Sequence, residues 1–389
     1  MIYPLASSTW DDKEIAAIQR VVDSGMFTMG DNVRRFEEAF AAKHGKKYGV
    51  MVNSGSSANL VGVAALTLRK ERPLQRGDEV LVPAVSWSTT YYPWHQYGIK
   101  LRFVDVELDT LNIDTSLLEA ALTPQTRAVC AVSILGNPAA LGELRAFCDK
   151  HGLYLFEDNC ESLGATLGGK LAGSFGDLGT FSFFFSHHIA TMEGGMVLTD
   201  DFELYCLLRA VRNHGWTRDQ PPGSPLFDAR DDDFFEAYRF VVPGYNVRPV
   251  ELSGAIGLAQ IEKLDDIVDG RRRNAAHFQS LFAGDKRFIT QKENGRSSWF
   301  ALTLILNPDL ALDRKRILGA LKEADIGYRI ITGGCFLRQD VIRHLEHSAA
   351  GPIVKANIAH DHGFFVGNHA FDVRPQIDLL HTVLDKAAQ

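Results

Sequence analysis

The sequence predicts an α/β protein in which a mostly parallel sheet of seven strands has helices on both faces. Short apolar runs recur along the first 200 residues, and the segments between them carry apolar residues at helical spacing. Few polar residues interrupt these runs, which is typical of strands that are covered on both faces. A polar loop at residues 217–235 ends the pattern, and a smaller unit with strands and helices follows. We therefore expect a large domain over residues 1–249 and a small α+β domain over residues 250–389.

The elements follow this plan in order along the chain. Ser8 and Thr9 precede an acidic turn and apolar residues at helical spacing, which predicts a capped amphipathic helix, and a second helix is expected at about 31–44. The seven strands are expected at 48–52, 79–83, 101–104, 127–135, 153–156, 181–185 and 196–199, with a helix at 58–68 after the first of them. Beyond the polar loop we expect helices from 250 through 282, at 312–324 and from 374, and strands at 299–306 and 328–331.

Composition and charge argue against several classes of protein. Of the 389 residues, 46% are hydrophobic and 23% are charged, as in a globular protein with a large core. The net charge of −7 argues against a nucleic-acid binder, which needs a basic surface. No apolar run reaches the ~18 residues that span a bilayer, and the first residues lack the pattern of a signal peptide. The five cysteines form no CxxC pair, so we expect no disulfide framework, no metal site and a cytoplasmic location.

Three stretches carry side chains suited to ligand binding or catalysis. The first, Asn53-Ser54-Gly55-Ser56-Ser57-Ala58-Asn59, lies between a strand and the start of a helix. Free backbone N–H groups and the positive end of the helix dipole favour an anion there, and phosphate is the natural ligand. The alternative is a serine-rich helix cap without a ligand.

The second stretch contains an acidic residue at a strand end. Asp158 follows the apolar strand 153–156, at the edge of the sheet where open α/β folds bind their ligands. A buried carboxylate there needs a cationic partner or several donors, and a protonated pyridine nitrogen would satisfy it. A helix-capping aspartate is the alternative.

The third stretch contains two adjacent histidines. His187 and His188 lie between Ser182, near the end of a strand, and the pair Gly194-Gly195. Neighbouring side chains point in different directions in a strand or a helix, so a metal shared by both histidines is not expected. Histidine suits proton transfer because its pKa lies near neutral pH. The alternative is a loop histidine that is solvated or structurally hydrogen-bonded.

Further candidates lie in loops beside the predicted ligand crevice. Trp87 follows a strand end and can stack on a flat ring, with core packing as the alternative. The candidates for substrate contacts are His188, His214, Arg218 and Arg248. A single loop arginine can equally lie on the surface, so this assignment stays open. The run Arg271-Arg272-Arg273 is interpreted as a solvated helix face.

Together, the order and spacing of these motifs resemble the sugar-aminotransferase family of fold-type-I vitamin B6 enzymes, over essentially the whole chain. The resemblance implies an aspartate-aminotransferase-like fold. It also implies pyridoxal 5'-phosphate (PLP) and its amine form, pyridoxamine 5'-phosphate (PMP), as cofactors. The resemblance implies that the cofactor phosphate is bound by Gly55, Ser56, Ser57 and Ser182, and that Asn246 contacts the phosphate bound in the other subunit. It implies that Trp87 stacks on the cofactor ring. Asp158 would pair with the pyridine nitrogen, and Glu161 would lie near the ring hydroxyl.

One departure from the family pattern bears on function. At the position of the lysine that carries the Schiff base in the family, this sequence has His187, and the glycine pair after it is retained. This exchange is typical of the family's 3-dehydratases, which make 3,6-dideoxysugars. The resemblance therefore implies a cofactor that is not covalently bound, with His187 as the catalytic base.

The resemblance also implies the reactants. The implied substrate is GDP-4-keto-6-deoxy-D-mannose, in colitose biosynthesis for the lipopolysaccharide O-antigen, and L-glutamate would regenerate PMP and leave as 2-oxoglutarate. A homodimer with shared active sites is implied, with no nucleic-acid or membrane partner. Three alternatives stay open, namely a nucleotide-sugar 4-aminotransferase, a CDP-sugar 3-dehydratase and a non-catalytic family member. Retention of Asp158, Glu161 and Ser182 argues against the last of these.

Overall fold

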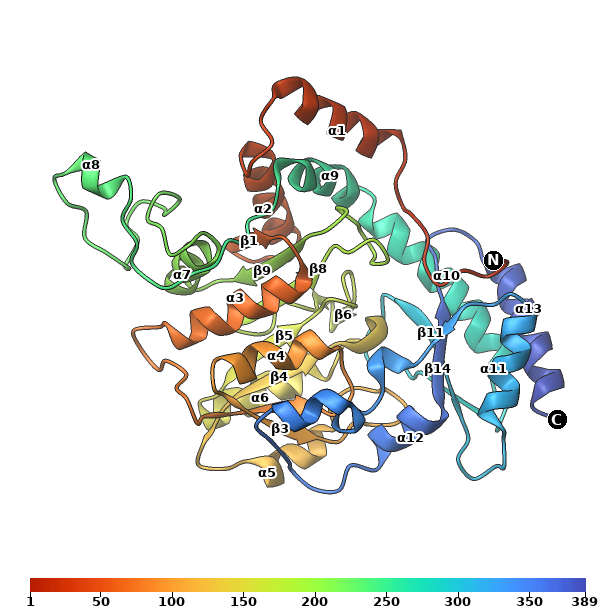
Figure 1. The fold of residues 1–389 in the computed structure, drawn as a ribbon. Helices are drawn as coiled ribbons and strands as arrows, with labels where there is room; N and C mark the ends of the chain where they lie inside the picture. Colours follow the sequence, from red (N-terminus) through yellow and green to blue (C-terminus); the bar gives the residue numbers. More distant parts are fainter.

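The computed structural model describes residues 1–389, which form two main sheets joined by a long helix (Figure 1). The large sheet has eight strands in the order β1-β9-β8-β5-β4-β2-β3-β13. These are β1 (Tyr48–Val52), β2 (Glu79–Pro83), β3 (Lys100–Val104), β4 (Thr126–Val132), β5 (Tyr154–Asp158), β8 (Leu178–Ser182), β9 (Gly195–Thr199) and β13 (His347–Ala349). The expected mostly parallel sheet is confirmed, since only β9 runs antiparallel to its neighbours. Each predicted strand has a counterpart, although the strand expected at 181–185 lies at 178–182.

The prediction of seven strands was wrong by one. The eighth strand, β13, comes from the C-terminal part of the chain and pairs in parallel with β3 at the edge of the large sheet. Its three residues, His347-Ser348-Ala349, contain no apolar run. The local sequence therefore carries no strand signal, and only the neighbouring strand makes this segment extended.

Helices cover both faces of the large sheet, as predicted. One face packs against α3 (Gly55–Thr67), α4 (Ser88–Gln96) and α7 (Phe202–Arg212). The other packs against α2 (Asp31–Lys43), α5 (Leu118–Ala121), α6 (Leu141–His151) and the first half of α10 (Leu264–Phe282). Val80 and Val82 of β2 join the first core and Leu81 joins the second, which is why these strands read as continuous apolar runs.

The predicted N-terminal capped helix is confirmed as α1 (Asp12–Ser24). Asp11 and Glu14 form a reciprocal capping box at its start, which satisfies two backbone N–H groups that the helix leaves free. The helix packs against α9 (Glu251–Ile261), which in turn packs on α2. These three helices form the upper part of the molecule in Figure 1.

The small sheet is antiparallel, in the order β10-β11-β14-β12. Its strands are β10 (Phe288–Thr290), β11 (Ala301–Leu306), β12 (Tyr328–Arg329) and β14 (Gly363–Gly367). They pack against the second half of α10, α11 (Arg314–Glu323) and α13 (Arg374–Ala387), whereas α12 (Lys355–His362) packs toward the large core. The N-terminal Tyr3 belongs to the small core, where its hydroxyl donates a hydrogen bond to the Gly367 carbonyl at 2.6 Å.

The division of domains at residues 249 and 250 stays a prediction. Packing changes from the large to the small core within α10, where Ile267 and Val268 contact the first and Ala275 and Phe278 the second. We propose that α10 is the connecting helix. None of the helices is long and apolar enough to cross a membrane.

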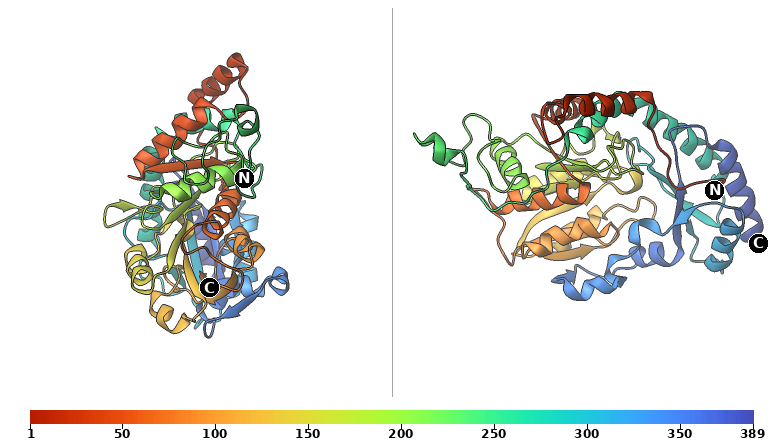
Figure 2. Two further views of the ribbon diagram at one scale, coloured as in Figure 1. Left: turned by 90° about the vertical axis from the view of Figure 1, so that its left-hand side faces the viewer. Right: turned by 45° about the horizontal axis from the view of Figure 1, so that its top comes forward.

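The predicted polar loop projects from the body of the molecule (Figures 1 and 2). It carries one short helix, α8 (Asp233–Glu236), whose Phe234 is 93% exposed. A second small projection is the hairpin of β6 (Thr166–Leu167) and β7 (Lys170–Leu171).

Candidate active site

The C-terminal ends of β5 and β8 meet the start of α3 on the side of the large sheet where its parallel strands end. Ser54 caps α3, and its Oγ accepts a hydrogen bond from the Ser57 N–H at 3.1 Å. A Cβ atom on Gly55 would lie 2.5 Å from the Cβ of Ser182, so glycine allows the helix to approach the end of β8 this closely. Gly55, Ser56, Ser57 and Ser182 therefore lie together, which is the arrangement that the predicted phosphate site needs.

Asp158 ends β5 and is buried, with 4% of its surface exposed. One carboxylate oxygen accepts hydrogen bonds from Asn59 Nδ2 at 2.9 Å and from Thr90 Oγ1 at 2.8 Å. The other accepts one from the Cys160 N–H at 3.1 Å. All three donors are neutral, so none of them balances the negative charge. A protonated pyridine nitrogen would balance it, whereas the helix-cap alternative fails because turns, not a helix, follow β5.

Asn59 and Thr90 are functional candidates that the sequence reasoning missed. Thr180 Oγ1 donates to Asn59 Oδ1 at 2.6 Å, and the Ser86 and Thr90 hydroxyls lie 2.8 Å apart. These bonds fix the direction in which the amide and the hydroxyl meet Asp158. Asn59 lies one helical turn after Gly55, so its position on the site side of α3 could have been inferred. No local signal identifies Thr90.

Glu161 lies three residues beyond Asp158, and its Oε2 accepts a hydrogen bond from the Leu135 N–H at 2.9 Å. Burial raises the pKa of Glu161 to about 8. The bond from Leu135 lowers this pKa, and the nearby negative charge of Asp158 raises it further. The carboxyl group is therefore mostly protonated at neutral pH and can donate a hydrogen bond, which suits the predicted contact with a ring oxygen.

Replacing Glu161 with glutamine should remove one source of pH-dependent instability. The pKa of about 8 in the folded protein exceeds the ordinary 4.5, so the wild type loses unfolding free energy as the pH rises through this window. We expect the Glu161→Gln variant to gain stability relative to the wild type with rising pH, by about 1.4 kcal/mol for each unit of pKa difference removed. Urea unfolding at about pH 5 and about pH 9 measures this gain, with Glu71→Gln at an exposed position as the control. An equal difference at both pH values would contradict the expectation.

His187 lies in the turn between β8 and β9. Its ring meets Phe184 and Phe300 edge to face, with ring centroids 6.0 and 5.2 Å away. Its Nδ1 is buried without a hydrogen-bond partner. Burial, and then the positive charge of Arg271, lower the pKa of His187 to about 3. The imidazole is therefore neutral at neutral pH, and Nε2, on the opposite side of the ring from the buried Nδ1, is the nitrogen that can accept a proton.

His188 points away from its neighbour into the protein. It has no exposed surface, and its Nε2 lies 3.0 Å from the Ser298 carbonyl. Burial lowers its pKa. A fully buried ring offers no face to a substrate, so we propose a packing role for His188 in place of the predicted substrate contact.

Trp87 immediately precedes α4, and 60% of its surface is exposed. The core-packing alternative is therefore wrong. The Ser56 hydroxyl donates to the Thr89 hydroxyl at 2.9 Å, which holds the start of α4 beside the start of α3. The exposed indole thus lies next to the predicted phosphate site, and its stacking on a ring stays a prediction.

Four predicted residues lie in two loops, one of which reaches the cluster through the Asn53 N–H, which donates to the Val247 carbonyl at 2.9 Å. These residues are His214, Arg218, Asn246 and Arg248. A bridge between Asn213 and Asn246 joins the two loops that carry them. Arg248 Nε donates to Asn246 Oδ1 at 3.0 Å, and the Arg218 guanidinium lies 5.1 Å from the centroid of the Trp216 ring. No side chain of these four bonds to the cluster at the strand ends, so their roles stay predictions.

The interpretation of Arg271-Arg272-Arg273 as a solvated face was wrong for its first residue. Arg271 is only 3% exposed, and its Nη1 donates to the carbonyls of Phe300 at 2.9 Å and Asn368 at 2.7 Å. Successive helical residues are about 100° apart, so three consecutive arginines cannot share one face. Only Arg273 is fully exposed.

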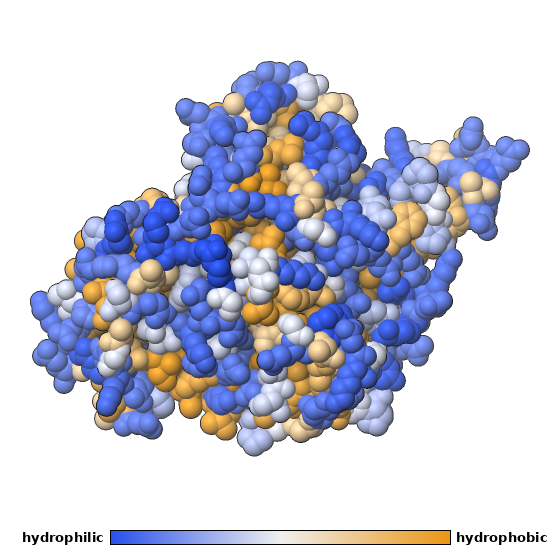
Figure 3. Space-filling model, turned by 180° about the vertical axis from the view of Figure 1, so that it is seen from behind, coloured by the Kyte–Doolittle hydropathy of each residue, from blue (hydrophilic) through white to orange (hydrophobic).

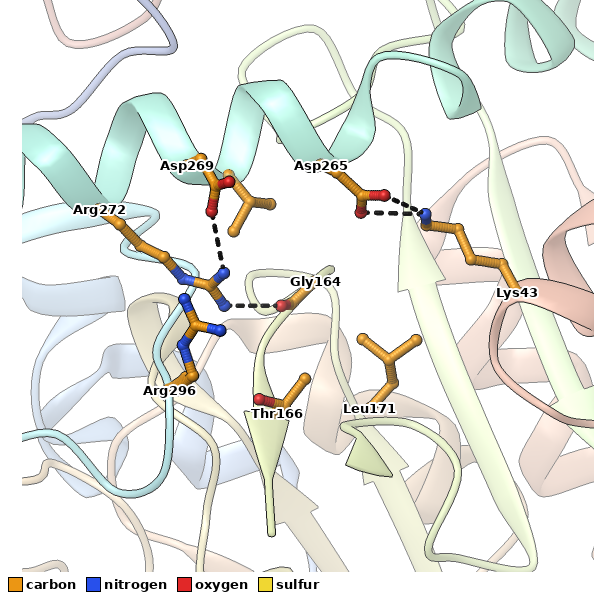
Figure 4. Close-up of a pocket in the computed structure, with 9 residues that line it drawn as sticks. Lys43, Gly164, Thr166, Leu171, Asp265, Asp269, Arg272 and Arg296 are labelled. Atoms are coloured by element: carbon orange, nitrogen blue, oxygen red, sulfur yellow. Dashed lines mark hydrogen bonds and ion pairs between the residues drawn. The ribbon is translucent and has the colours of Figure 1, made fainter. Parts of the chain in front are cut away.

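A separate surface pocket of about 330 Å³ lies below α10 (Figure 4). Four of its five charged side chains form ion pairs, Lys43 with Asp265 and Arg272 with Asp269, whereas Arg296 forms none. None of the predicted site residues lines this pocket. Within the chain, no three His, Cys, Asp or Glu side chains are grouped as a metal site.

The chain is similar to known proteins over almost its whole length. Residues 8–368 match the DegT/DnrJ/EryC1/StrS aminotransferase family. The chain is 49% identical over 386 residues to the GDP-4-keto-6-deoxy-D-mannose 3-dehydratase of Yersinia pseudotuberculosis, covering 99% of this chain and 98% of that protein. A crystal structure of GDP-4-keto-6-deoxymannose-3-dehydratase with a trapped PLP-glutamate geminal diamine aligns with a TM-score of 0.96 and 48% identity, over 98% of this chain and 100% of that one.

One more solved structure is informative about the histidine. It is a variant of that enzyme in which a serine and the histidine directly after it are replaced by asparagine and lysine. It aligns with a TM-score of 0.95 and 47% identity, over 97% of this chain and 100% of that one.

Proposed function

The chain belongs to the DegT/DnrJ/EryC1/StrS aminotransferase family, and we propose that it is a PLP- and PMP-dependent 3-dehydratase that removes the C3 hydroxyl group of GDP-4-keto-6-deoxy-D-mannose. One observation carries this proposal. A neutral histidine, His187, stands where the family resemblance places the Schiff-base lysine. No lysine occurs between Lys170 and Lys263, so no other residue of this turn can take that role.

The site residues fit the cofactor. The absence of a side chain at Gly55 lets the start of α3 approach Ser182, which brings the N–H groups of the helix start and the Ser182 hydroxyl together for a phosphate. The buried charge of Asp158 suits a protonated ring nitrogen. The choice of His187 over His188 has independent support, because serine directly precedes histidine only at Ser186 in this chain. The lysine-carrying variant of the solved relative changes such a serine–histidine pair.

The chain's own groups would act as follows. When bound, the cofactor supplies an amine for the keto carbon of the sugar and a ring that accepts electrons. Asp158 keeps the ring nitrogen protonated through its charge, and Glu161 donates a hydrogen bond to a ring oxygen. His187 accepts a proton at Nε2, the nitrogen on the opposite side of the ring from the buried Nδ1, and returns it to the oxygen of the departing C3 hydroxyl group.

Glutamate would complete the cycle. Its amino group restores PMP, and 2-oxoglutarate leaves. Because His187 cannot form a Schiff base, the cofactor is held without a covalent bond. We place the reaction in colitose biosynthesis for the lipopolysaccharide O-antigen, and in the cytoplasm, where the five free thiols fit a reducing compartment.

We further propose a homodimer with shared active sites. Apolar side chains are exposed in the turn that holds His187, at Phe184 (45%), Phe185 (49%) and Met192 (47%). Seen from behind, the molecule also has apolar surface in a hollow of that face (Figure 3). A second copy that covers such surface would exclude water and bring the partner's Asn246 to the phosphate. Light scattering should give twice the 43.1 kDa mass of the chain, and a monomer would contradict the proposal.

The function is tested by whether the amine nitrogen that comes from glutamate is released as ammonia or stays on the sugar. The purified protein is incubated with PLP, L-glutamate and GDP-4-keto-6-deoxymannose, and ammonia and the sugar product are measured. We expect ammonia and a 3-deoxy-4-keto sugar, with slower turnover of the matching CDP-linked keto sugar. A stable 4-amino sugar would instead identify an aminotransferase, and no turnover of either sugar would favour a non-catalytic member.

A further inference from the structure

Two backbone segments meet beneath the turn that holds His187. Leu135 and Trp299 both have left-handed backbone angles, with φ of 51° and 49°. The Phe300 N–H donates to the Leu135 carbonyl at 3.0 Å, and the Ser298 N–H donates to the Gly136 carbonyl at 2.9 Å. Residues that lead into the small sheet are therefore fixed to the loop after β4.

Both backbone polar groups of Phe300 are engaged. Its N–H binds Leu135, and its carbonyl accepts a hydrogen bond from the buried guanidinium of Arg271 at 2.9 Å. Arg271 also donates to the Asn368 carbonyl, so it joins α10, β11 and the segment after β14 at one point. These bonds hold the backbone of Phe300 from two sides and so limit the positions that its ring can take.

The ring of Phe300 meets His187 edge to face, at 5.2 Å between centroids and 72° between planes. No hydrogen bond of the chain orients His187 on the buried side, because its Nδ1 has no partner. A catalytic imidazole is usually oriented by a hydrogen bond to the nitrogen that does not react. Here aromatic packing has to do this instead.

We propose that Phe300 is a positioning residue for His187: its ring edge sets the plane of the imidazole and keeps water from the buried nitrogen, while Arg271 and Leu135 fix Phe300. This inference rests on the proposed role of His187 in the dehydration. It also links the small sheet to the chemistry, because Phe300 directly precedes β11. Leu135 supports two groups of the proposed site, because its N–H donates a hydrogen bond to Glu161 and its carbonyl accepts one from the Phe300 N–H.

The test compares Phe300→Leu with Phe300→Tyr. Leucine removes the ring edge, whereas tyrosine keeps it. Phe364→Leu is the matched control, because Phe364 is buried in the small core away from the site. Two readouts are taken: the titration of His187 in the cofactor-free protein, followed by NMR of labelled histidine and assigned with a His187→Asn sample, and kcat and KM for the sugar nucleotide.

We expect Phe300→Leu to admit water and to move the His187 pKa from about 3 back toward its ordinary 6.5. Its kcat should fall about 10²-fold, as for a misplaced catalytic group, with KM unchanged. Phe300→Tyr and Phe364→Leu should keep the wild-type titration and kcat. A Phe300→Leu protein with wild-type titration and kcat would overturn the proposal, as would equal losses in the leucine and tyrosine variants. If the wild type fails to dehydrate the sugar while Phe300→Leu still moves the titration, the proposed function falls and the positioning role stands.

Discussion

Replacing His187 with asparagine should lower the rate of dehydration by about 10²- to 10⁴-fold, the usual contribution of a general acid–base group. Asparagine keeps a polar, planar group at Cγ but lacks the ring that packs on Phe300, and it cannot accept and return a proton. Cofactor binding should change little, because the phosphate and ring contacts come from other residues. Steady-state release of ammonia and the absorbance of bound cofactor measure the two effects separately.

The companion variant, His187→Lys, tests the same position from the other side. A lysine there should form a Schiff base with PLP, so reduction with borohydride should fix the cofactor to the protein. The wild type should yield no such adduct. A lysine adduct in the wild type would contradict the proposed non-covalent cofactor, and full dehydration by His187→Asn would move the base role to another residue.

The second large effect is expected at Asp158. The Asp158→Asn variant keeps a group of the same shape beside Asn59 and Thr90 but loses the charge that would hold the ring nitrogen protonated. Loss of one partner from a buried charge pair costs about 2–5 kcal/mol, and we expect that loss to be divided between cofactor affinity and kcat. Equilibrium dialysis with PMP and single-turnover rates measure the two parts.

Thr90→Val serves as the control for Asp158. It removes one hydrogen bond to the carboxylate and leaves the charge. The loss of free energy, again divided between cofactor affinity and kcat, should therefore be about 1.5–3 kcal/mol, which is typical of a hydrogen bond to a charged group. Wild-type affinity and turnover in Asp158→Asn would mean that this carboxylate does not pair with the ring.

The sequence predicted the large sheet well because its strands are covered on both faces and read as unbroken apolar runs. It failed at β13, where His347-Ser348-Ala349 become extended only because β3 has a free edge beside them. It also failed at Arg271. Three adjacent charges resemble a solvated face, but the helical repeat turns the first of them inward, onto carbonyls of Phe300 and Asn368.

The site was predictable where it lies within short, ordered motifs. Gly55, Asp158, Ser182 and His187 each lie within five residues of the C-terminal end of a strand, and a parallel sheet gathers these ends on one side. The supporting groups were not predictable, because Thr90 and Phe300 reach the site from elements distant in sequence. The different directions of His187 and His188 follow from their being adjacent, but which one faces inward depends on Ser298, more than 100 residues away.

β13 and Tyr3 both pack against elements that are distant from them in sequence, and this affects how the chain folds as it is synthesised. β3 is complete at residue 104, yet its edge partner ends at residue 349, so at 5–20 residues per second the ribosome leaves that edge uncovered for about 10–50 s. Tyr3 emerges long before β14 and α13, and its core forms only when those elements have been made. The two units therefore cannot be completed one after the other, and an unpaired strand edge is open to pairing with other chains during that interval. We expect slower translation, or a shortage of chaperones, to lower the yield of this protein. The loss should be larger than for a protein whose domains are completed one after the other along the chain.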